Sequence, residues 1–443
     1  MKLPPLLIET LPSGLTAVAI QRRGLPLFHV RLSLPAGTCE DPRGKAGLSS
    51  FTVDLLRRGT RRRPAREVDD LIESMGAQLY ADASMEEASL ALTVPEELAG
   101  PSLDALLEVA LEPLFDEEEV AAMRRRTIAG LSSDLDEAAT VAGRAVVTLG
   151  YGPGHPYAHP GAGLRRNVET FVREDALAFH ATRFQQEGAL IAVVGAAEPQ
   201  ALFQLLREKL EQWEKSWPAK SQRAPLDFAT LAPRTGLRGV VVHKPDATQA
   251  QVRIVAPGEP RNTPRYAEAV VANTALGGGF TSLLVDAIRV DRGLSYSVST
   301  RLHMHRRAGL AVFSSFTRNQ TLRELLDVAL DNMRRYARAG PSSDALDKAR
   351  RYLAGLFPLG IESHEALAEQ VADAILDGLG LSHLTSYRQR MLAVTPEGAR
   401  EAAAALSPAR DGALIIVVGD GETAQRALEG LCPVEVRPLD EFA

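Results

Sequence analysis

The sequence contains little that could cross-link the chain or anchor it in a bilayer. Of its 443 residues only two are cysteines, Cys39 and Cys432, and neither belongs to a C-x-x-C pair. This argues against a disulfide framework and against a cysteine zinc site. No run approaches the roughly 18 apolar residues of a membrane-spanning helix, and the N-terminus lacks the apolar core of a signal peptide. We therefore expect a cytoplasmic protein with no membrane contact, and a periplasmic protein if translation starts upstream.

The chain also lacks an excess of positive charge. It has 50 Lys and Arg residues against 56 Asp and Glu residues, which gives a formal net charge of -6. This balance argues against a general nucleic-acid binder. An arginine-rich run, 57–63, lies close to acidic residues, and we interpret it as a solvated turn. With 45% hydrophobic and 24% charged residues, the composition is that of a globular protein with two or three domains.

The chain repeats itself at a nearly constant distance. Four pairs of similar segments are separated by 224, 225, 222 and 222 residues: 188–195 with 412–419, 125–130 with 350–355, 30–32 with 252–254, and 14–15 with 236–237. A constant offset over such widely spaced segments indicates a duplicated unit of about 220 residues. We predict an N-terminal domain over 1–212, a polar, proline-containing linker over 213–233, and a C-terminal domain over 234–443.

The hydrophobic period changes along each half. Residues 15–20 and 28–34 alternate at period two, which is typical of half-buried strands, and strand character returns over 78–94. Helical spacing covers 47–58, 66–75, 102–111 and 117–138, and a further helix follows a Gly, His and Pro-rich loop at 150–164. Strands and helices that do not alternate singly indicate an α+β fold, with helices covering an antiparallel sheet in each domain.

Three segments of the N-terminal half resemble a known family. Residues 36–40, 47–60 and 72–77 are similar to the first helix, and the stretch after it, of the M16 metallopeptidases, the pitrilysin-like inverzincins. Catalytic members carry H-x-x-E-H on this helix, where two histidines bind zinc and the glutamate is the general base. The corresponding positions here are Ser50, Val53 and Asp54. The resemblance therefore implies duplicated M16 domains, but no zinc site and no cofactor in this chain.

Other histidines do not replace the missing ligands. His155 and His159 have i, i+4 spacing, but two prolines place them in a loop, so they need not share a face. We interpret His364 as part of a solvated helix start, and we expect His303 and His305 to point together towards solvent. The third zinc ligand of the family would fall near 128–137, where acidic residues occur without the expected context.

One strand of the N-terminal half resembles the family's substrate-pairing strand. Residues 78–84 include Leu79, Tyr80 and Ala81. In β-augmentation, an extended peptide pairs with such an edge through main-chain hydrogen bonds. A purely internal edge strand is the alternative interpretation.

The C-terminal half retains a motif that the first half has lost. Residues 276–284 and 288–298 contain a triple glycine followed by Arg289 and, seven residues later, Tyr296. No phosphate-loop pattern fits the glycines, so a tight turn into a helix is expected. In M16 peptidases the resemblance implies that this Arg/Tyr pair binds the substrate backbone and stabilises the oxyanion. An ion pair of Arg289 with Asp286 or Asp291, with Tyr296 as packing, is the alternative.

Together the two halves resemble the non-catalytic subunit of a heterodimeric M16 peptidase. Its expected partner is an M16 subunit that carries H-x-x-E-H and zinc, and its expected ligands are unfolded peptides rather than nucleic acid or membrane. The alternatives are an inactive structural M16 homologue and a peptide-binding or chaperone-like module. A neighbouring reading frame for an H-x-x-E-H protein of similar length would favour the heterodimer.

Overall fold

The structure, a computed structural model, describes residues 2–221, 226–228, 235–407 and 412–443. Residues 222–225 and 229–233 of the predicted linker lie outside these ranges. The chain forms two compact units. Unit 1 comprises Met1–Leu131, Pro160–Leu226 and Pro358–Ser386, and unit 2 comprises Ser132–His159, Asp227–Phe357 and Tyr387–Ala443. Each unit therefore takes a segment from the opposite half of the sequence.

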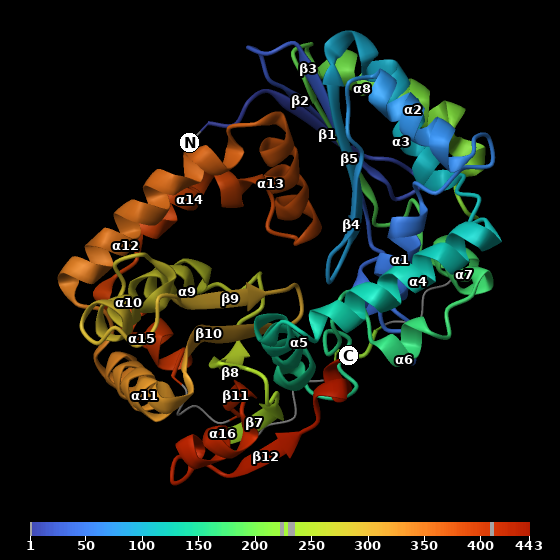
Figure 1. Cartoon of the computed structure of the whole chain (residues 1–443). Helices are drawn as coiled ribbons and strands as arrows, with labels where there is room; N and C mark the ends of the chain where they lie inside the picture. The colour runs from blue at the N-terminus through green and yellow to red at the C-terminus, as the bar shows by residue number, and fades with distance from the viewer. Residues whose placement is uncertain (1, 222–225, 229–234, 408–411) are drawn as a thin grey trace. The chain divides into compact units, whose positions relative to one another are not determined.

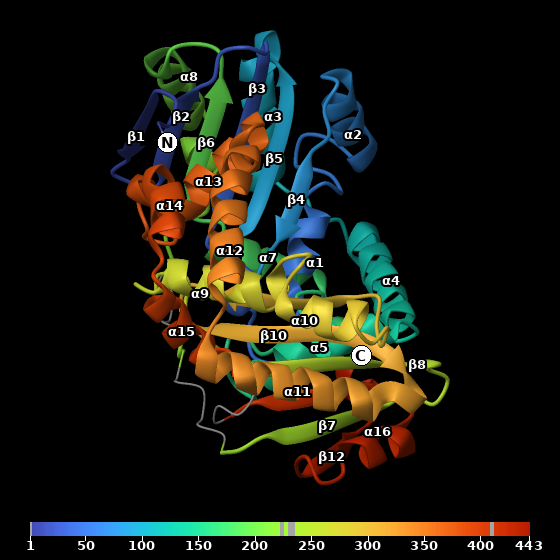
Figure 2. The same cartoon turned by 90° about the vertical axis from the view of Figure 1, so that its left-hand side faces the viewer.

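Unit 1 contains a six-stranded sheet with the order β1-β2-β6-β3-β5-β4, which Figure 2 shows side by side. Its strands are β1 (Leu6–Thr10), β2 (Thr16–Gln21), β3 (Leu27–Leu34), β4 (Tyr80–Ala83), β5 (Ala88–Pro95) and β6 (Leu190–Gly195). Neighbours pair antiparallel except β2 and β6, which run parallel. Strand β4 is the edge next to β5.

Unit 2 repeats this arrangement with the order β12-β7-β11-β8-β10-β9. Its strands are β7 (Arg238–His243), β8 (Gln249–Gly258), β9 (Val298–Met304), β10 (Gly309–Arg318), β11 (Leu414–Gly419) and β12 (Val434–Arg437). Strands β7 and β11 are parallel, as β2 and β6 are, whereas β12 joins parallel at the edge where β1 is antiparallel. The equivalent strand order confirms the predicted duplication.

Helices cover both faces of the unit 1 sheet. Helix α13 (His364–Leu376) packs on β3 and β6, and α3 (Ala99–Leu111) and α8 (Pro199–Gln212) lie on the opposite face (Figures 1 and 2). The remaining helices of this unit are α1 (Leu48–Leu55), α2 (Ala65–Ser74), most of α4 (Glu117–Asp134), α6 (Arg165–Val168), α7 (Arg173–Arg183) and the first part of α14 (Leu381–Ala393).

Unit 2 is covered in the same way. Helix α5 (Ala138–Tyr151) packs on β8 and β11, and α11 (Leu322–Ala339) and α16 (Gly421–Leu428) lie on the opposite face (Figures 1 and 2). The unit also contains α9 (Tyr266–Asn273), α10 (Leu283–Val285), α12 (Ser343–Leu356) and α15 (Pro396–Ala405). Helices α5 and α13 are thus the exchanged elements, since each lies on the sheet of the other half.

The exchange explains the most strongly repeated segments of the sequence. Strands β6 and β11 are uninterrupted apolar runs, and every residue in both is buried. A strand needs such a run only where both faces of its sheet are covered. The exchanged helix supplies the second cover in each unit, so the apolar runs and the exchange depend on each other.

The predicted α+β class is confirmed, with two refinements. The sheets are mixed rather than purely antiparallel, because β6 pairs parallel with β2, and β11 and β12 pair parallel with β7, after long connections along the chain. The helix predicted over 117–138 corresponds to α4, whereas α5 was not predicted. In the structure, α4 ends at Asp134 and α5 begins at Ala138.

One helical stretch among the described residues, Tyr266–Val290, is long and apolar enough to cross a membrane, whereas no such stretch was predicted from the sequence. Half of its apolar window is buried. It is also interrupted by wider turns at Thr274–Gly278 and Asp286–Val290. Leu284 and Ile288 from this stretch belong to the core of unit 2, so the apolar composition is explained by packing.

Two histidines are buried where α13 meets the sheet of unit 1. The Nδ1 atom of His29 on β3 lies 2.9 Å from the hydroxyl of Thr93, and His364 is the first residue of α13. Among the described residues, the buried Nε2 atoms of both rings have no hydrogen-bond partner. Burial first, then the charges of Arg31 and His364, lower the pKa of His29 to about 4. His29 is therefore neutral in the folded chain at pH 7.

Acid should destabilise unit 1 through His29. The unfolded state has the higher pKa, so stability is fully present above pH 6.5 and is lost as the pH falls towards 4. At pH 5 we expect His29 to account for a loss of about 2 kcal/mol in the free energy of unfolding. Both tryptophans, Trp213 and Trp217, lie in the unit 1 core, so urea unfolding followed by their fluorescence reports this unit.

The variant His29→Asn, which keeps a donor and acceptor near Thr93, should lose less stability between pH 7 and pH 5 than the wild type. The exposed His243 of unit 2 offers the control variant His243→Asn. This variant should lose as much stability between pH 7 and pH 5 as the wild type does. Equal losses in wild type and His29→Asn would contradict the assignment.

Candidate functional site

The helix that resembles the zinc helix is built as the family resemblance implies, but without its ligands. Helix α1 starts after Gly47, whose φ of 94° places it in the left-handed region. A Cβ there would lie 2.6 Å from the Cα of Gly163, so only glycine fits. The two carboxyl oxygens of Asp41 accept hydrogen bonds of 2.7 Å from the backbone N–H groups of Gly47 and Ser49. The helix start is therefore well defined.

The three motif positions on α1 have structural surroundings. Ser50 donates its hydroxyl to the carbonyl of Gly161 at 2.8 Å, and Val53 is fully buried in the core of unit 1. Asp54 lies on an exposed part of the helix, where desolvation and then the charge of Asp82 raise the pKa of its carboxyl. No group of three or more His, Cys, Asp or Glu side chains that could hold a metal occurs in the described part of the chain.

The strand predicted to pair with a peptide lies at a sheet edge. Tyr80 and Ala81 belong to β4, which pairs only with β5 in the described sheet. Tyr80 is exposed, whereas Leu79 is buried just before the strand and its carbonyl accepts a hydrogen bond from Arg57. The outer side of β4 therefore has the geometry that strand addition needs, and Leu79 contributes to the fold.

Arg289 and Tyr296 are adjacent in unit 2. The guanidinium carbon of Arg289 lies 4.5 Å from the centroid of the Tyr296 ring and 5.0 Å from that of Phe280. Tyr296 is 76% exposed, and Arg289 is half-buried. Within the described residues, neither the guanidinium nor the phenol hydroxyl has a hydrogen bond or an ion pair. The alternative ion pair with Asp286 or Asp291 is therefore not formed in the structure.

The chain fixes this pair through the turns that surround it. Arg289 lies in the wide turn Asp286–Val290, which is anchored by the buried Ile288 and by a 2.9 Å hydrogen bond from Leu294 N–H to the Ile288 carbonyl. After Gly293, Ser295 is buried and its hydroxyl donates to the carbonyl of Ser297. Tyr296 thus lies between two residues anchored by hydrogen bonds, and its side chain is exposed.

Two sequence profiles of one peptidase family match the chain. The profile described as insulinase, peptidase family M16, matches residues 18–144, and the profile described as peptidase M16 inactive domain matches residues 170–353. The chain belongs to peptidase family M16. The family resemblance inferred from residues 36–77 and 276–298 is thereby confirmed. Because the chain lacks H-x-x-E-H, it is an inactive homologue within M16.

Relatives and solved structures agree with this family. An uncharacterized zinc protease of Streptomyces coelicolor is 24% identical over 402 residues, which are 89% of this chain and 85% of that protein. A non-peptidase homolog, YmxG, of Helicobacter pylori is 23% identical over 343 residues, 76% of this chain and 77% of that protein. The crystal structure of a peptidase M16 inactive domain from Pseudomonas fluorescens has a TM-score of 0.86 at 23% identity, covering 94% of this chain and 98% of that chain. At these identities the structural likeness shows the M16 fold.

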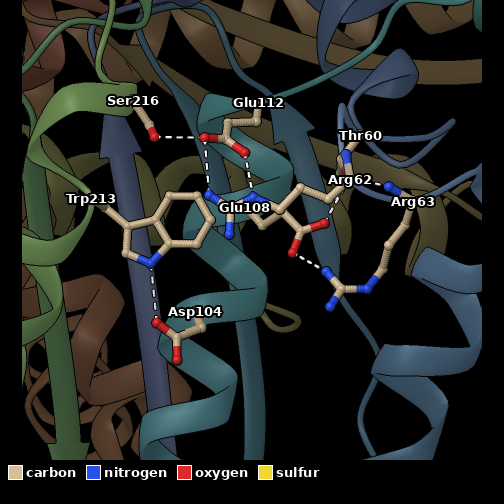
Figure 3. Close-up of polar contacts among 8 residues, drawn as sticks. All are labelled: Thr60, Arg62, Arg63, Asp104, Glu108, Glu112, Trp213 and Ser216. Atoms are coloured by element: carbon tan, nitrogen blue, oxygen red, sulfur yellow. Dashed lines mark hydrogen bonds and ion pairs between the residues drawn. The ribbon is translucent and has the colours of Figure 1, made fainter.

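Arg57, Arg62 and Arg63 of the arginine-rich run form ion pairs. Figure 3 shows Arg62 bound to Glu112 through two hydrogen bonds of 2.6 and 3.1 Å, with its guanidinium 4.4 Å from the ring of Trp213. Arg63 pairs with Glu108, which is buried and also accepts a 2.7 Å hydrogen bond from Thr60. These arginines hold the start of the predicted linker on α3, so the interpretation as a merely solvated turn understated their role.

The histidines of this M16 chain differ from the sequence-based expectation. His364 follows the N-cap Ser363 as predicted, but its side chain is buried rather than solvated. His303 is half-buried, and burial lowers its pKa. His305 packs 5.0 Å from the ring of Tyr157. Both strand-end histidines therefore belong to the packing of unit 2.

One residue of the site was not identified from the sequence. Phe280 contacts Arg289, although it follows the triple glycine and matches no hydrophobic period. An isolated aromatic residue directly after a glycine turn has no expected place in the core, and this could have indicated a functional role for Phe280.

Removing the buried carboxylate of Glu108 should destabilise unit 1. The variant Glu108→Ala removes the hydrogen-bond partner of the partly exposed Arg63 and of the buried Thr60, and the loss of hydrogen bonds to a charged group costs about 2 kcal/mol. Urea unfolding followed by tryptophan fluorescence measures the loss. Glu73→Ala, which removes an exposed carboxylate from α2, should change stability by less than about 0.5 kcal/mol. Similar stabilities for the two variants would refute the structural role of Glu108.

Proposed function

We propose that this chain is the non-catalytic, substrate-binding subunit of a heterodimeric zinc-dependent M16 peptidase. Its partner is an M16 chain that carries H-x-x-E-H, and this chain supplies Arg289 and Tyr296 to the partner's active site for peptide hydrolysis. One observation carries the proposal: the two side chains are adjacent and accessible, and their polar groups have no partner among the described residues. We propose a cytoplasmic location for the complex.

The chemistry is divided between the two subunits. When bound by the H-x-x-E-H partner, zinc would supply an activated water and polarise the scissile carbonyl. Negative charge then develops on the carbonyl oxygen of the peptide. The Arg289 guanidinium and the Tyr296 hydroxyl donate hydrogen bonds to this oxygen or to the neighbouring main chain. Donors that are already positioned before the reaction stabilise developing charge more effectively than water that must reorient.

The edge strand β4 offers a second contact with the same class of ligand. Its outer main-chain groups can pair with an extended peptide whatever its side chains. This property suits an unfolded substrate of varied sequence. The exposed Tyr80 and the half-buried Ala81 would then form one wall of the peptide path in unit 1, and the buried Leu79 would support it from the core.

A second candidate is an inactive M16 homologue that binds peptides or supports another complex without taking part in hydrolysis. The relative named as a non-peptidase homolog favours it. The two candidates differ in one respect. Only the first requires that Arg289 and Tyr296 influence catalysis in another chain, whereas the second predicts peptide binding that is indifferent to both.

Substitution of the pair should lower turnover in the reconstituted complex. With an H-x-x-E-H partner encoded next to this chain, Arg289→Ala and Tyr296→Phe should each reduce kcat by about 10²-fold, because each removes one oxyanion donor. Tyr296→Phe keeps the ring that contacts Arg289 and therefore tests the hydroxyl alone. Initial rates of peptide cleavage at saturating substrate measure the effect.

The matched control is Arg292→Ala. Arg292 is an exposed arginine of the same segment, and its guanidinium pairs with Glu324 at 3.4 Å rather than with an aromatic ring. This variant should cleave peptide at the wild-type rate. If all three variants turn over like the wild type, Arg289 and Tyr296 have no catalytic role and the second candidate function is favoured.

A further inference from the structure

Phe280 is an aromatic residue with no packing role in the core. It is 77% exposed, and it lies in the short segment between the wide turn Thr274–Gly278 and α10. Exposed single apolar residues are common on protein surfaces and need no explanation by themselves. The position of Phe280 does need an explanation, because the centroid of its ring lies 5.0 Å from the guanidinium carbon of Arg289.

The backbone fixes where the Phe280 ring can be. On one side, Gly279 N–H donates to the carbonyl of Thr274 at 3.0 Å. On the other side, Ser282 is buried and its carbonyl accepts a hydrogen bond from Asp286 N–H at 3.0 Å. The turn itself is packed against β9, since a Cβ on Gly277 would lie 2.7 Å from the Thr300 side chain. Phe280 is therefore held between two anchored points only three residues apart.

Two rings from separate segments contact one guanidinium. Phe280 precedes α10, and Tyr296 follows the turn that contains Arg289. Among the described aromatic residues the two rings do not contact each other, so each meets the guanidinium independently. Aromatic rings attract a guanidinium but accept none of its in-plane N–H groups as a carboxylate would. The contacts restrict the side chain and leave its donors available.

We propose that Phe280 is a positioning residue that holds Arg289 for a planar oxygen acceptor, either a peptide carbonyl or a carboxylate. The proposal rests on the function proposed above and adds a third residue to the Arg289–Tyr296 pair. Phe280 does not contact the reacting atoms in this account. It limits the orientations of the guanidinium, so that the donors face the acceptor before the peptide arrives.

A double-mutant cycle in the reconstituted heterodimer tests this role. Phe280→Ala should lower kcat/KM by about tenfold, which is the range expected for one cation–π contact. Phe280→Trp should restore most of the loss, because indole also binds a guanidinium. In an Arg289→Ala background, Phe280→Ala should have no further effect, since nothing is left to position. Val290→Ala removes an equally exposed neighbour outside the ring contacts and should match the wild type.

Three results would overturn the proposal. They are an unchanged kcat/KM in Phe280→Ala, a loss that persists in the Arg289→Ala background, and a change confined to the dissociation constant of the heterodimer. The last result would make Phe280 a subunit-docking residue instead. If Arg289→Ala itself has no effect, the proposed function fails rather than the positioning role.

A measurement on the isolated chain separates these failures. In an NMR spectrum of arginine-labelled protein, the Arg289 side-chain Nε–Hε signal is identified by its loss in Arg289→Ala. Ring currents should displace it from the ordinary arginine position, and Phe280→Ala should shift it towards that position. Val290→Ala should not. An Arg289 signal that is the same in wild type and Phe280→Ala would show that the contact does not form, whatever the partner does.

Discussion

The guanidinium of Arg289 is held by aromatic rings rather than by carboxylates, and the functional account depends on this choice of partner. A carboxylate would bind the N–H groups that a substrate oxygen needs, whereas a ring restrains the side chain and leaves them available. Arg62 of the same chain shows the contrast. Its guanidinium also lies against a ring, that of Trp213, but two of its hydrogen bonds go to Glu112. Arg62 is a structural residue for that reason.

The two halves carry different motifs of the M16 family. In the first half the scaffold of the zinc helix remains, with a glycine start and Asp41 binding its first N–H groups, while its ligand positions serve the fold. Val53 is the clearest case, because the position of the general base in H-x-x-E-H is now an apolar core residue. In the second half the turns that present Arg289 and Tyr296 are intact and well anchored. Absence of the zinc ligands alongside an intact Arg289–Tyr296 pair is the pattern that the proposed role as a partner subunit requires.

Much of this could be read from the sequence because the relevant signals are local. The repeat offset predicted the duplication, and the motif positions predicted where zinc ligands are missing and where the Arg289–Tyr296 pair lies. The exchange of α5 and α13 could not be predicted, since local periodicity carries no information on which sheet a helix will cover. The fully apolar strands β6 and β11 did imply cover on both faces. His364 is buried because it begins the exchanged helix α13. The expectation of a solvated helix start at this position was therefore wrong.

The central claim is that this chain completes an active site that it cannot form alone, and a reconstitution titration tests it most directly. A fixed amount of the H-x-x-E-H partner is mixed with increasing amounts of this chain, and peptide cleavage and bound zinc are measured at each ratio. The account predicts that this chain alone binds no stoichiometric zinc and cleaves nothing, and that activity rises with added chain to a plateau at a 1:1 ratio. Zinc binding and peptide cleavage by the isolated chain, or partner activity that is independent of it, would contradict the claim.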